Sequence, residues 1–390
     1  MKILVISQYY SPEPFKVADV CEALAEEGHQ VDVVTSFPNY PMGEIYEGYK
    51  NSLHKKELIN GINVHRIFTI GRKSGFLFRI LNYYTFSLCS TLFVNKLKKD
   101  YDVVFVYQLS PVLMANAGLR YKKKHNKKLL LYCLDLWPDS LTSGGIRQGS
   151  LVYRYFEKVS ARIYRSCDKI LVSSKMFASH LKEQFSIENI SYLPQYAESV
   201  FKPEAVPAKD TVDFTFAGNI GSAQSVETIL YAAKILKDEN IKFHIVGDGS
   251  ELEGCKKIAD KHNLSNVIFH GRKPVEEMPE IYKNSDAMLV TLIADPVISK
   301  TLPGKVQTYM AAGKPIIGAV IGETAQVIKE AGCGFVAPAQ DSEKLAEVIR
   351  EFLKSDKVLL GENSYKYYEK HFNKDIFTKT LTEELSKVSR

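Results

Sequence analysis

The sequence lacks the features that would place it among membrane-spanning or disulfide-rich proteins. No run of about 18 uncharged apolar residues occurs in its 390 residues, so we predict no membrane-spanning helix. The N-terminal residues form a short apolar run without the small-residue cleavage site of a secretory signal, and we expect a buried strand there. The six cysteines are scattered with no CxxC pair, which favours reduced thiols in a cytoplasmic protein over a zinc site or disulfides.

Metal and dinucleotide fingerprints are also missing. No paired acidic motif indicates a metal site, and no GxGxxG is complete. The formal net charge is +6 and uneven: residues 1–200 hold 26 Lys and Arg against 18 Asp and Glu, whereas residues 201–390 hold 25 against 27. A basic first half suits an anionic membrane or a phosphorylated acceptor, and a solvated basic face without a partner explains it equally well. We expect no nucleic-acid partner.

Short apolar runs typical of buried strands alternate regularly with segments whose apolar residues recur at helical spacing. A polar stretch with two prolines, residues 198–210, divides this alternation and is the predicted linker. Strand–helix–strand units with short links predict an α/β protein with two doubly wound, parallel-sheet domains facing a central cleft. We place the domains at residues 1–200 and 201–390, and terminal helices within 365–390 can pack back on the first. The predicted strands are residues 2–7, 31–35, 103–107, 129–133, 169–173, 213–217, 242–246, 267–270, 287–291 and 315–318.

Glycine turns follow two predicted strands of the second domain. Gly218 and Gly221 permit close backbone approach of a ligand, and the amides lead to a helix start where a phosphate is favoured. A plain structural turn is the alternative. Gly247 lies in half of a dinucleotide fingerprint, and a turn is the favoured interpretation there.

Residues 303–315 carry the most informative pattern. Pro303 and Gly304 set a turn before a helix whose first turn contains Lys305, and Gly313 caps its end. The helix dipole disfavours a cation at that end, so Lys305 makes sense if a diphosphate binds beside it. A simple strand–turn–helix–turn–strand unit would leave the lysine unexplained.

Two further segments in the first domain have two interpretations each. Asp135, Trp137 and Ser140 follow the strand 129–133, where an α/β domain presents reactive groups, but a helix cap would also use such residues. Residues 72–99 combine an aromatic and aliphatic centre with basic ends, which is typical of a helix in a membrane interface or of one packed inside the domain. Its basic residues are Arg72, Lys73, Arg79, Lys96, Lys98 and Lys99.

Taken together, these residues resemble the family 4 retaining glycosyltransferases of the GT-B fold. The similarity covers nearly the whole chain and points to the branch that builds bacterial O-antigen and capsule repeats, which includes proposed N-acetyl-fucosamine transferases. Its most specific motifs are Pro-Asn-Tyr-Pro at 38–41 and Asp-Leu-Trp-Pro at 135–138.

The resemblance implies roles for particular residues. The second domain would hold the nucleotide diphosphate, with residues 270–273 at the base, and the first domain would hold the acceptor. Asp135 lies where many relatives carry a histidine that touches the donor sugar. Expected donor residues are Lys16, Gly218, Asn219, Gly221, Gln224, Gly247, Gly271, Arg272, Pro303, Gly304, Lys305, Val306 and Thr308, and expected acceptor-side residues are Asn39, Tyr40 and Trp137.

The sequence departs from the family pattern at four places. Asn219 and Gln224 stand where many members carry Arg and Lys. Lys300 and Thr308 stand where the general pattern has two glutamates. We infer that Lys300 and Lys305 meet the phosphate charge, and with Asp135 they are the expected catalytic residues.

The resemblance therefore implies a retaining, metal-independent glycosyltransferase. Its donor would be a UDP-linked nucleotide sugar that carries an N-acetylated or deoxy hexose. Its acceptor would be an undecaprenyl-diphosphate-linked saccharide at the cytoplasmic face of the inner membrane. Two alternatives stay open: a sugar-nucleotide epimerase of the same fold, and a non-catalytic nucleotide-sugar-binding subunit.

Overall fold

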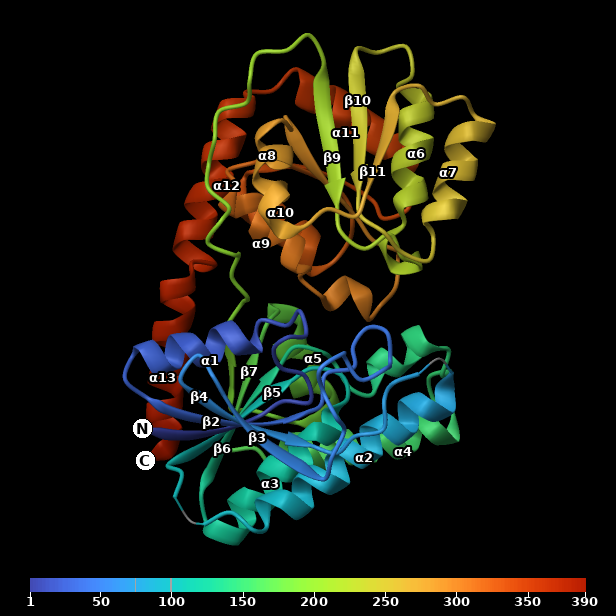
Figure 1. The fold of residues 1–390 in the computed structure, drawn as a ribbon. Coiled ribbons are helices and arrows are strands. Elements are labelled where there is room, and N and C mark those ends of the chain that lie inside the picture. The colour runs from blue at the N-terminus through green and yellow to red at the C-terminus, as the bar shows by residue number, and fades with distance from the viewer. Residues whose placement is uncertain (74, 99) are drawn as a thin grey trace. The chain divides into compact units, whose positions relative to one another are not determined.

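A computed structural model describes residues 1–73, 75–98 and 100–390, so the predicted basic residue Lys99 lies outside the described residues. The chain divides into two compact units. The first comprises Met1–Ser173, Phe177–Leu193 and Thr378–Arg390, and the second comprises Ser174–Met176 and Pro194–Phe377. Figure 1 shows each unit as a sheet with helices on both of its sides.

The first unit has an eight-stranded sheet in the order β3-β4-β2-β1-β5-β6-β7-β8. Neighbouring strands are parallel except β3 and β4. The strands are β1 (Lys2–Ile6), β2 (Gln30–Ser36), β3 (His54–Ile59), β4 (Ile62–Ile67), β5 (Val103–Gln108), β6 (Lys128–Cys133), β7 (Lys169–Val172) and β8 (Ile190–Tyr192). The helices are α1 (Val17–Glu26), α2 (Phe76–Val94), α3 (Ala115–His125), α4 (Leu151–Arg165), most of α5 (Lys175–Phe185) and most of α13 (Lys374–Ser389).

The second unit has a six-stranded parallel sheet in the order β11-β10-β9-β12-β13-β14. Its strands are β9 (Val212–Ala217), β10 (Ile241–Val246), β11 (Val267–Gly271), β12 (Ala287–Thr291), β13 (Ile316–Ala319) and β14 (Gly334–Ala337). Its helices are α6 (Val226–Ile235), α7 (Leu252–Lys261), α8 (Met278–Lys283), α9 (Gly304–Ala311), α10 (Glu323–Ala331), α11 (Ser342–Leu353) and α12 (Lys357–His371).

The central strands explain why apolar runs predicted these sheets. Every residue of β5 and of β12 is buried, because helices cover both faces of a parallel sheet. Clusters of buried side chains therefore form on the sheets, among them one around β1, β5 and β6, one around β9, β10 and β12, and one between β12, β13 and α9. The predicted α/β class with two doubly wound sheets is confirmed.

One hairpin was not predicted from the sequence. Strands β3 and β4 pair antiparallel around Asn60 and Gly61, whose φ angles are 47° and 80°. Strand β3 lies at the sheet edge and is largely exposed, so it carries charged residues in place of an apolar run. Asn-Gly is the turn pair that positive φ at both positions requires, and it was the available signal.

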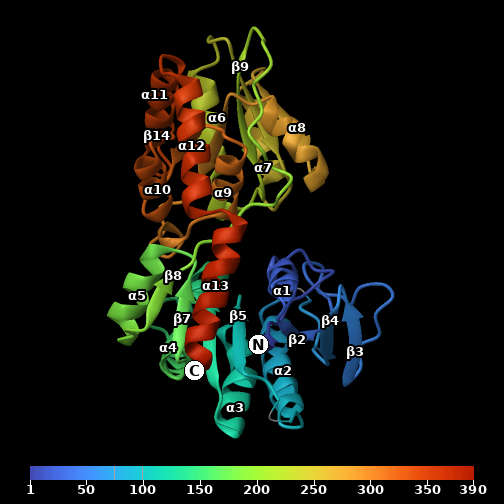
Figure 2. The same ribbon diagram turned by 90° about the vertical axis from the view of Figure 1, so that its left-hand side faces the viewer.

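The C-terminal helix returns to the first sheet. Residues 378–390, which include most of α13, belong to the first unit, where Glu384 lies 3.6 Å from Lys169 at the start of β7 (Figure 2). Within the described part of the chain, none of the helices has the length and apolar character needed to cross a bilayer.

Candidate functional site

Two glycine turns lie side by side at the carboxyl ends of β9 and β10. Gly218 and Gly247 both have φ of 142°, which disfavours residues with a side chain. The Gly218 amide donates to Val246 O at 2.9 Å, and the Gly247 amide donates to Gly271 O at 2.9 Å. A Cβ on Gly247 would lie 1.8 Å from Gly218 O. The turns therefore need glycine for packing against each other, which is the structural role favoured for Gly247 from the sequence.

Lys305 lies directly over the first of these turns. It occupies the first turn of α9, as predicted, and its Nζ would lie 2.9 Å from a Cβ placed on Gly218. Its Nζ donates to Gln224 Oε1 at 2.9 Å and lies 3.8 Å from the centroid of the Phe216 ring. The structure thus brings together Gly218, Gln224 and Lys305, which the sequence had assigned to one site.

The surroundings of this lysine are neutral. Within the described residues no carboxylate forms an ion pair with Lys305, and burial lowers the pKa of its ammonium to about 7. The positive end of the α9 dipole adds to the cost of a cation there. A bound anion would remove this cost, because an opposite charge within a few ångströms favours the protonated lysine.

Helix α9 is held in place by residues that the sequence analysis did not single out. The Tyr309 hydroxyl donates to Ala217 O and accepts from Ala217 N, both at 3.0 Å. Phe216 supplies the ring under Lys305. Both are apolar or aromatic residues in predicted elements, and only the tertiary pairing of α9 with β9 gives them these roles.

The other predicted donor residues have different surroundings. Asn219 is exposed, and Gly221 lies beside its amide group. Val306 is fully buried, and the Thr308 hydroxyl donates to Gly304 O at 3.0 Å on its own helix.

Lys300 ends a short 3-10 turn, and its carbonyl accepts from Ser174 Oγ at 2.5 Å. Pro303 and Gly304 begin α9, Gly271 ends β11, and Arg272 follows it in an exposed position.

In the first unit, Asp135 follows β6 and is held by neighbouring side chains. Its carboxylate accepts from the Ser140 hydroxyl, and Gln108 Nε2 donates to its carbonyl at 2.9 Å. Burial raises the pKa of Asp135, while hydrogen bonds from Ser140, Ser110 and Trp137 oppose the rise. A carboxyl group in this setting can orient a sugar hydroxyl or accept a hydrogen bond from it.

A second carboxylate ties two loops of the first unit together. Glu13 is 3% exposed and accepts from the amides of Asn39, Tyr40 and Tyr10 at 2.9, 2.8 and 3.3 Å. Burial raises the pKa of Glu13, and these amides act against the rise. Asn39 in turn accepts from the Arg72 amide at 3.1 Å. Glu13 was not predicted as a site residue from the sequence, although a charge inside an apolar, proline-bearing loop was a signal.

The three predicted acceptor-side residues differ in exposure. Asn39 is fully buried and Trp137 is 1% exposed, with its ring against Tyr83 and Phe156. Tyr40 is partly exposed and packs on Phe15. These contacts give Asn39 and Trp137 packing roles, and their acceptor role stays a prediction. Lys16, the remaining predicted residue, directly precedes α1 and is partly exposed.

Metal-binding side chains do not gather anywhere in the described ranges. No group of three or more His, Cys, Asp or Glu is placed to hold a metal ion there. The six cysteines are free thiols.

Comparisons with known proteins agree with the two-unit fold. Residues 17–195 match the Glycosyltransferase Family 4 profile, and residues 199–371 match the Glycosyl transferases group 1 profile. The chain is 29% identical over 267 residues to the probable glycosyltransferase WbjE of Pseudomonas aeruginosa, covering 64% of this chain and 65% of that protein. It is 26% identical to the putative colanic acid biosynthesis glycosyl transferase WcaI of Escherichia coli K12, covering 80% of this chain and 82% of that protein.

A solved structure shares the whole architecture. Anabaena Alr3699/HepE in complex with UDP matches with a TM-score of 0.74 and 13% identity, over 99% of this chain and 100% of that one. At this identity the likeness concerns the fold. Since the two profiles cover the two units in turn, the chain belongs to the glycosyltransferases, with a Family 4 domain followed by a group 1 domain in the GT-B fold.

Proposed function

We propose that this chain transfers a hexose from a UDP-linked donor to a lipid-linked saccharide during bacterial surface-polysaccharide synthesis, with retained anomeric configuration. The observation that carries the proposal is Lys305, a cation at the start of α9 with Gln224 and a Phe216 ring as its neighbours and a pKa of about 7. A bound anion would favour the protonated form of this lysine, and the diphosphate of a nucleotide sugar fits a lysine beside a glycine turn and a helix start.

Relatives support the donor and pathway parts of the proposal. HepE was solved with UDP, and WcaI is named for colanic acid biosynthesis. The donor sugar is an N-acetylated or deoxy hexose, by resemblance to the O-antigen and capsule branch. The epimerase and the non-catalytic subunit are not favoured, because the matching profiles and the named relatives are glycosyltransferases.

The chemistry follows from where charge develops. The bond between the sugar's anomeric carbon and the β-phosphate oxygen breaks, and its electron pair stays on the diphosphate. Lys305 and Lys300 stabilise that negative charge. The acceptor hydroxyl forms the new bond on the same face and gives its proton to the β-phosphate. Asp135 holds a hydroxyl of the donor sugar, and the reaction needs no metal ion.

The acceptor is an undecaprenyl-diphosphate-linked saccharide at the cytoplasmic face of the inner membrane. The basic balance of residues 1–200 supports an anionic partner for the first unit.

The test is nucleotide release from a panel of UDP-sugars with and without lipid-linked acceptor, in buffer with and without EDTA. We expect acceptor-dependent release of UDP that EDTA leaves unchanged. A parallel thermal-shift series reports binding, since ligand at about 100 times its Kd stabilises a folded site by about 2.7 kcal/mol. Isomerisation without acceptor would support the epimerase, and binding without turnover would support the non-catalytic subunit. No shift with any nucleotide would overturn the donor site.

A further inference from the structure

A groove of about 850 Å³ opens on the first unit, away from the strand ends described above. It is lined by thirteen residues of α2, α3 and α4 and of the segments that follow α3 and α4. Five of these residues are Lys or Arg, and none is Asp or Glu. The basic lining residues are Arg120, Lys122, Lys123, Lys127 and Arg162.

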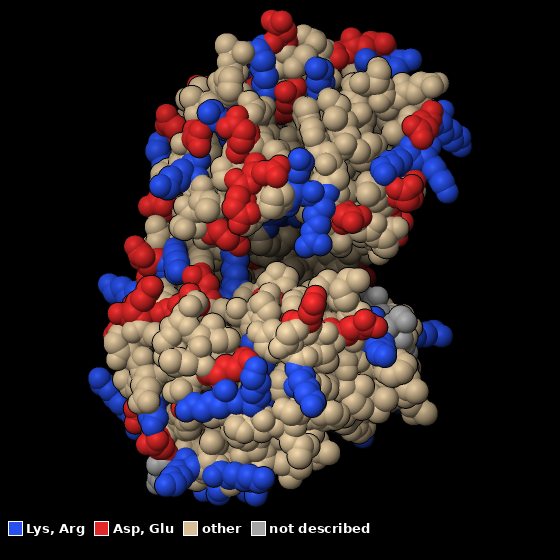
Figure 3. Space-filling view, viewed as in Figure 1, with Lys and Arg blue, Asp and Glu red and all other residues tan. Residues whose placement is uncertain are grey.

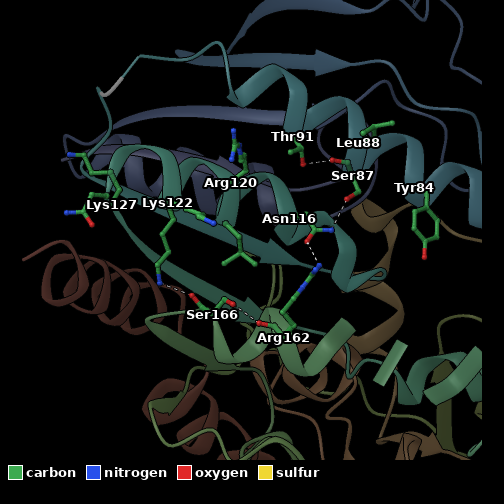
Figure 4. A pocket seen from close by; sticks show the side chains of 13 residues that line it. Tyr84, Ser87, Leu88, Thr91, Asn116, Arg120, Lys122, Lys127, Arg162 and Ser166 are labelled. Atoms are coloured by element: carbon green, nitrogen blue, oxygen red, sulfur yellow. Dashed lines mark hydrogen bonds between the residues drawn. The ribbon is translucent and has the colours of Figure 1, made fainter. Parts of the chain in front are cut away.

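The polar floor of the groove is organised by a chain of hydrogen bonds (Figure 4). Arg162 Nη2 donates to Asn116 Oδ1 at 3.4 Å, and Asn116 Nδ2 donates to Ser87 Oγ at 3.0 Å. These bonds connect α4, α3 and α2, and they leave the guanidinium of Arg162 at the groove wall. The groove is therefore a built feature of three packed helices.

Within the described residues, most of the cations in the groove have no anionic partner. Lys122 lies 2.6 Å from Asp168, and that pair is neutral overall. Arg120 donates to the amide oxygen of Asn95 at 2.6 Å. Among the described side chains, no carboxylate forms an ion pair with Arg120, Lys123, Lys127 or Arg162. Four cations with neutral neighbours around one groove favour an anionic ligand.

The basic end of α3 has a structural explanation that covers only part of this set. Lys122, Lys123, Lys124 and His125 occupy the last turn of α3, where cations complement the helix dipole. Arg162 lies in the last turn of α4, where the same explanation applies. Arg120 lies before the last turn of α3 and Lys127 lies beyond that helix, so the dipole does not explain these two. The helix dipole therefore does not account for the groove as a whole.

An apolar ridge borders the groove on α2. Leu77, Leu81, Tyr84, Leu88 and Leu92 recur at steps of three and four residues, which places them on one face of the helix. Leu77, Leu88 and Leu92 are 65%, 62% and 56% exposed. The opposite face of α2 packs inward through Tyr83, Phe86 and Val94, so the interpretation as a helix packed inside the domain holds for that face.

The ridge continues onto α4. The hydroxyl of Tyr84 donates to that of Tyr155 at 3.1 Å, and Tyr155 is itself half exposed. Leu151 and Val152 extend the exposed apolar surface at the start of α4. Figure 3 shows a largely uncharged surface where Figure 1 places α2 and α4, with Lys and Arg along the edge of the same unit near α3.

The geometry points to a docking site for an anionic bilayer: the apolar ridge of α2 and α4 enters the headgroup layer, and the groove takes the phosphate of an anionic phospholipid. Aliphatic and aromatic side chains beside a cluster of cations are the combination that binds at such an interface. Charge complementarity selects a lipid over a second protein copy, because a copy would bring the same unpaired cations to the same place. This inference deepens the proposed function, since a lipid-linked acceptor requires the enzyme to lie on the membrane.

The first test removes charge from the groove. The triple variant Arg120→Gln, Lys123→Gln, Lys127→Gln is compared with the parent in sedimentation with vesicles of phosphatidylcholine alone and of phosphatidylcholine with phosphatidylglycerol. We expect the parent to bind the anionic vesicles and the variant to bind them roughly 100-fold more weakly, at about fivefold for each cation near the surface. The matched control, Lys50→Gln, Lys56→Gln, Lys182→Gln, removes three exposed cations of the same unit outside the groove.

The outcomes of this test are distinct. An equal loss in the control variant would make net charge, and not the groove, responsible. Equal binding of the parent to both vesicle types would overturn the assignment of the groove. Titration of inorganic phosphate into the parent distinguishes a site for free anions from a site for lipid headgroups. Saturable phosphate binding without preference for anionic vesicles would overturn the lipid as the ligand of the groove.

The second test reports contact of the ridge with the bilayer. The chain has one tryptophan, Trp137, which is 1% exposed, so Leu88→Trp adds a reporter on the ridge. We expect its emission to shift to the blue with anionic vesicles, and Val358→Trp, at a 73% exposed position of the second unit, to stay unshifted. An unshifted Leu88→Trp would overturn insertion of the ridge.

These measurements use no donor. UDP binding by a variant that no longer binds vesicles would leave the donor part of the proposed function intact. Vesicle binding by a parent protein that does not bind UDP would overturn the donor site alone.

Discussion

The two units share one architecture, but the charged side chains at the carboxyl ends of their strands differ in sign and in hydrogen bonding. In the first, the carboxylates of Glu13 and Asp135 are already satisfied by amides and hydroxyls of their own loops. In the second, Lys305 has neutral neighbours and stands over glycine turns with no side chains. The hydrogen bonds of the first set of strand ends are made within the chain, whereas under the proposed function a bound anion would complete the second set. The same fold thus presents hydrogen-bonded carboxylates in one unit and a lysine with neutral neighbours in the other.

The largest effect should come from adding one methyl group to the glycine turns. Gly247→Ala places a Cβ 1.8 Å from Gly218 O at a φ of 142°, so we expect destabilisation by more than about 3 kcal/mol and loss of UDP binding. Thermal unfolding with and without UDP measures both. Gly254→Ala is the matched control, because Gly254 lies within α7 with open space around it and should gain about 0.5–1 kcal/mol. Similar melting curves for both variants would show that the turns do not depend on close packing.

Removing the cation tests the second unit more selectively. Lys305→Met keeps most of the side-chain volume and should weaken UDP by roughly 10- to 100-fold, since a hydrogen bond to a charged group contributes about 1.5–3 kcal/mol. Uridine, which has no phosphate, should bind as before. Calorimetric titration of both ligands gives the comparison, with Lys257→Met on the exposed face of α7 as the control. Equal losses for UDP and uridine would mean that Lys305 does not contact phosphate.

The difference between the units also explains what the sequence could predict. Lys305 and its glycine turn were accessible because a lysine in a first helical turn conflicts with the dipole locally. Phe216 and Tyr309 were not, because their roles arise when α9 packs on β9. In the first unit, Trp137 suggested an acceptor surface from its motif, yet its ring lies in the core. An aromatic residue near a strand end has the same sequence signature whether it faces a ligand or the interior.

The fold shows the same limit. Buried strands such as β5 and β12 were predicted because helices cover both of their faces and every residue is apolar or nearly so. The edge strand β3 was missed because its exposed residues follow no apolar pattern. For α2, the sequence left open a helix in a membrane interface and a helix packed inside the domain, and only the packing of Phe86 and Val94 separates its two faces.

Neutralising a carboxylate of the first unit should affect stability and leave donor binding alone. Glu13→Gln replaces one acceptor oxygen by an amide group that faces backbone N–H donors, so we expect a loss of about 1–3 kcal/mol. UDP affinity should stay within twofold of the parent. The control is Glu44→Gln, an exposed residue of the same unit, for which a change within about 0.5 kcal/mol is expected. A fall in UDP affinity for Glu13→Gln at unchanged stability would contradict the division of roles between the units.

The prediction that addresses the contrast most directly is the pH dependence of UDP affinity. Without ligand, burial holds the pKa of Lys305 at about 7, and a bound diphosphate raises it by favouring the ammonium form. Above pH 7 binding must therefore take up a proton, so affinity should fall by up to about tenfold per pH unit between pH 7 and pH 9. The phosphate itself does not titrate in that range, because its last pKa is about 6.

The matched measurement repeats the titration with Lys305→Met, in which the slope between pH 7 and pH 9 should vanish while weaker binding persists. Calorimetry in buffers of different ionisation enthalpy counts the protons taken up: a value approaching one is expected for the parent near pH 8.5 and zero for the variant. Proton uptake that persists in Lys305→Met would assign it to another group. Affinity that is flat with pH in the parent would mean that the lysine is already charged before the anion arrives. In that case the second unit would be as complete as the first, and the contrast between their strand ends would lie in side-chain type alone.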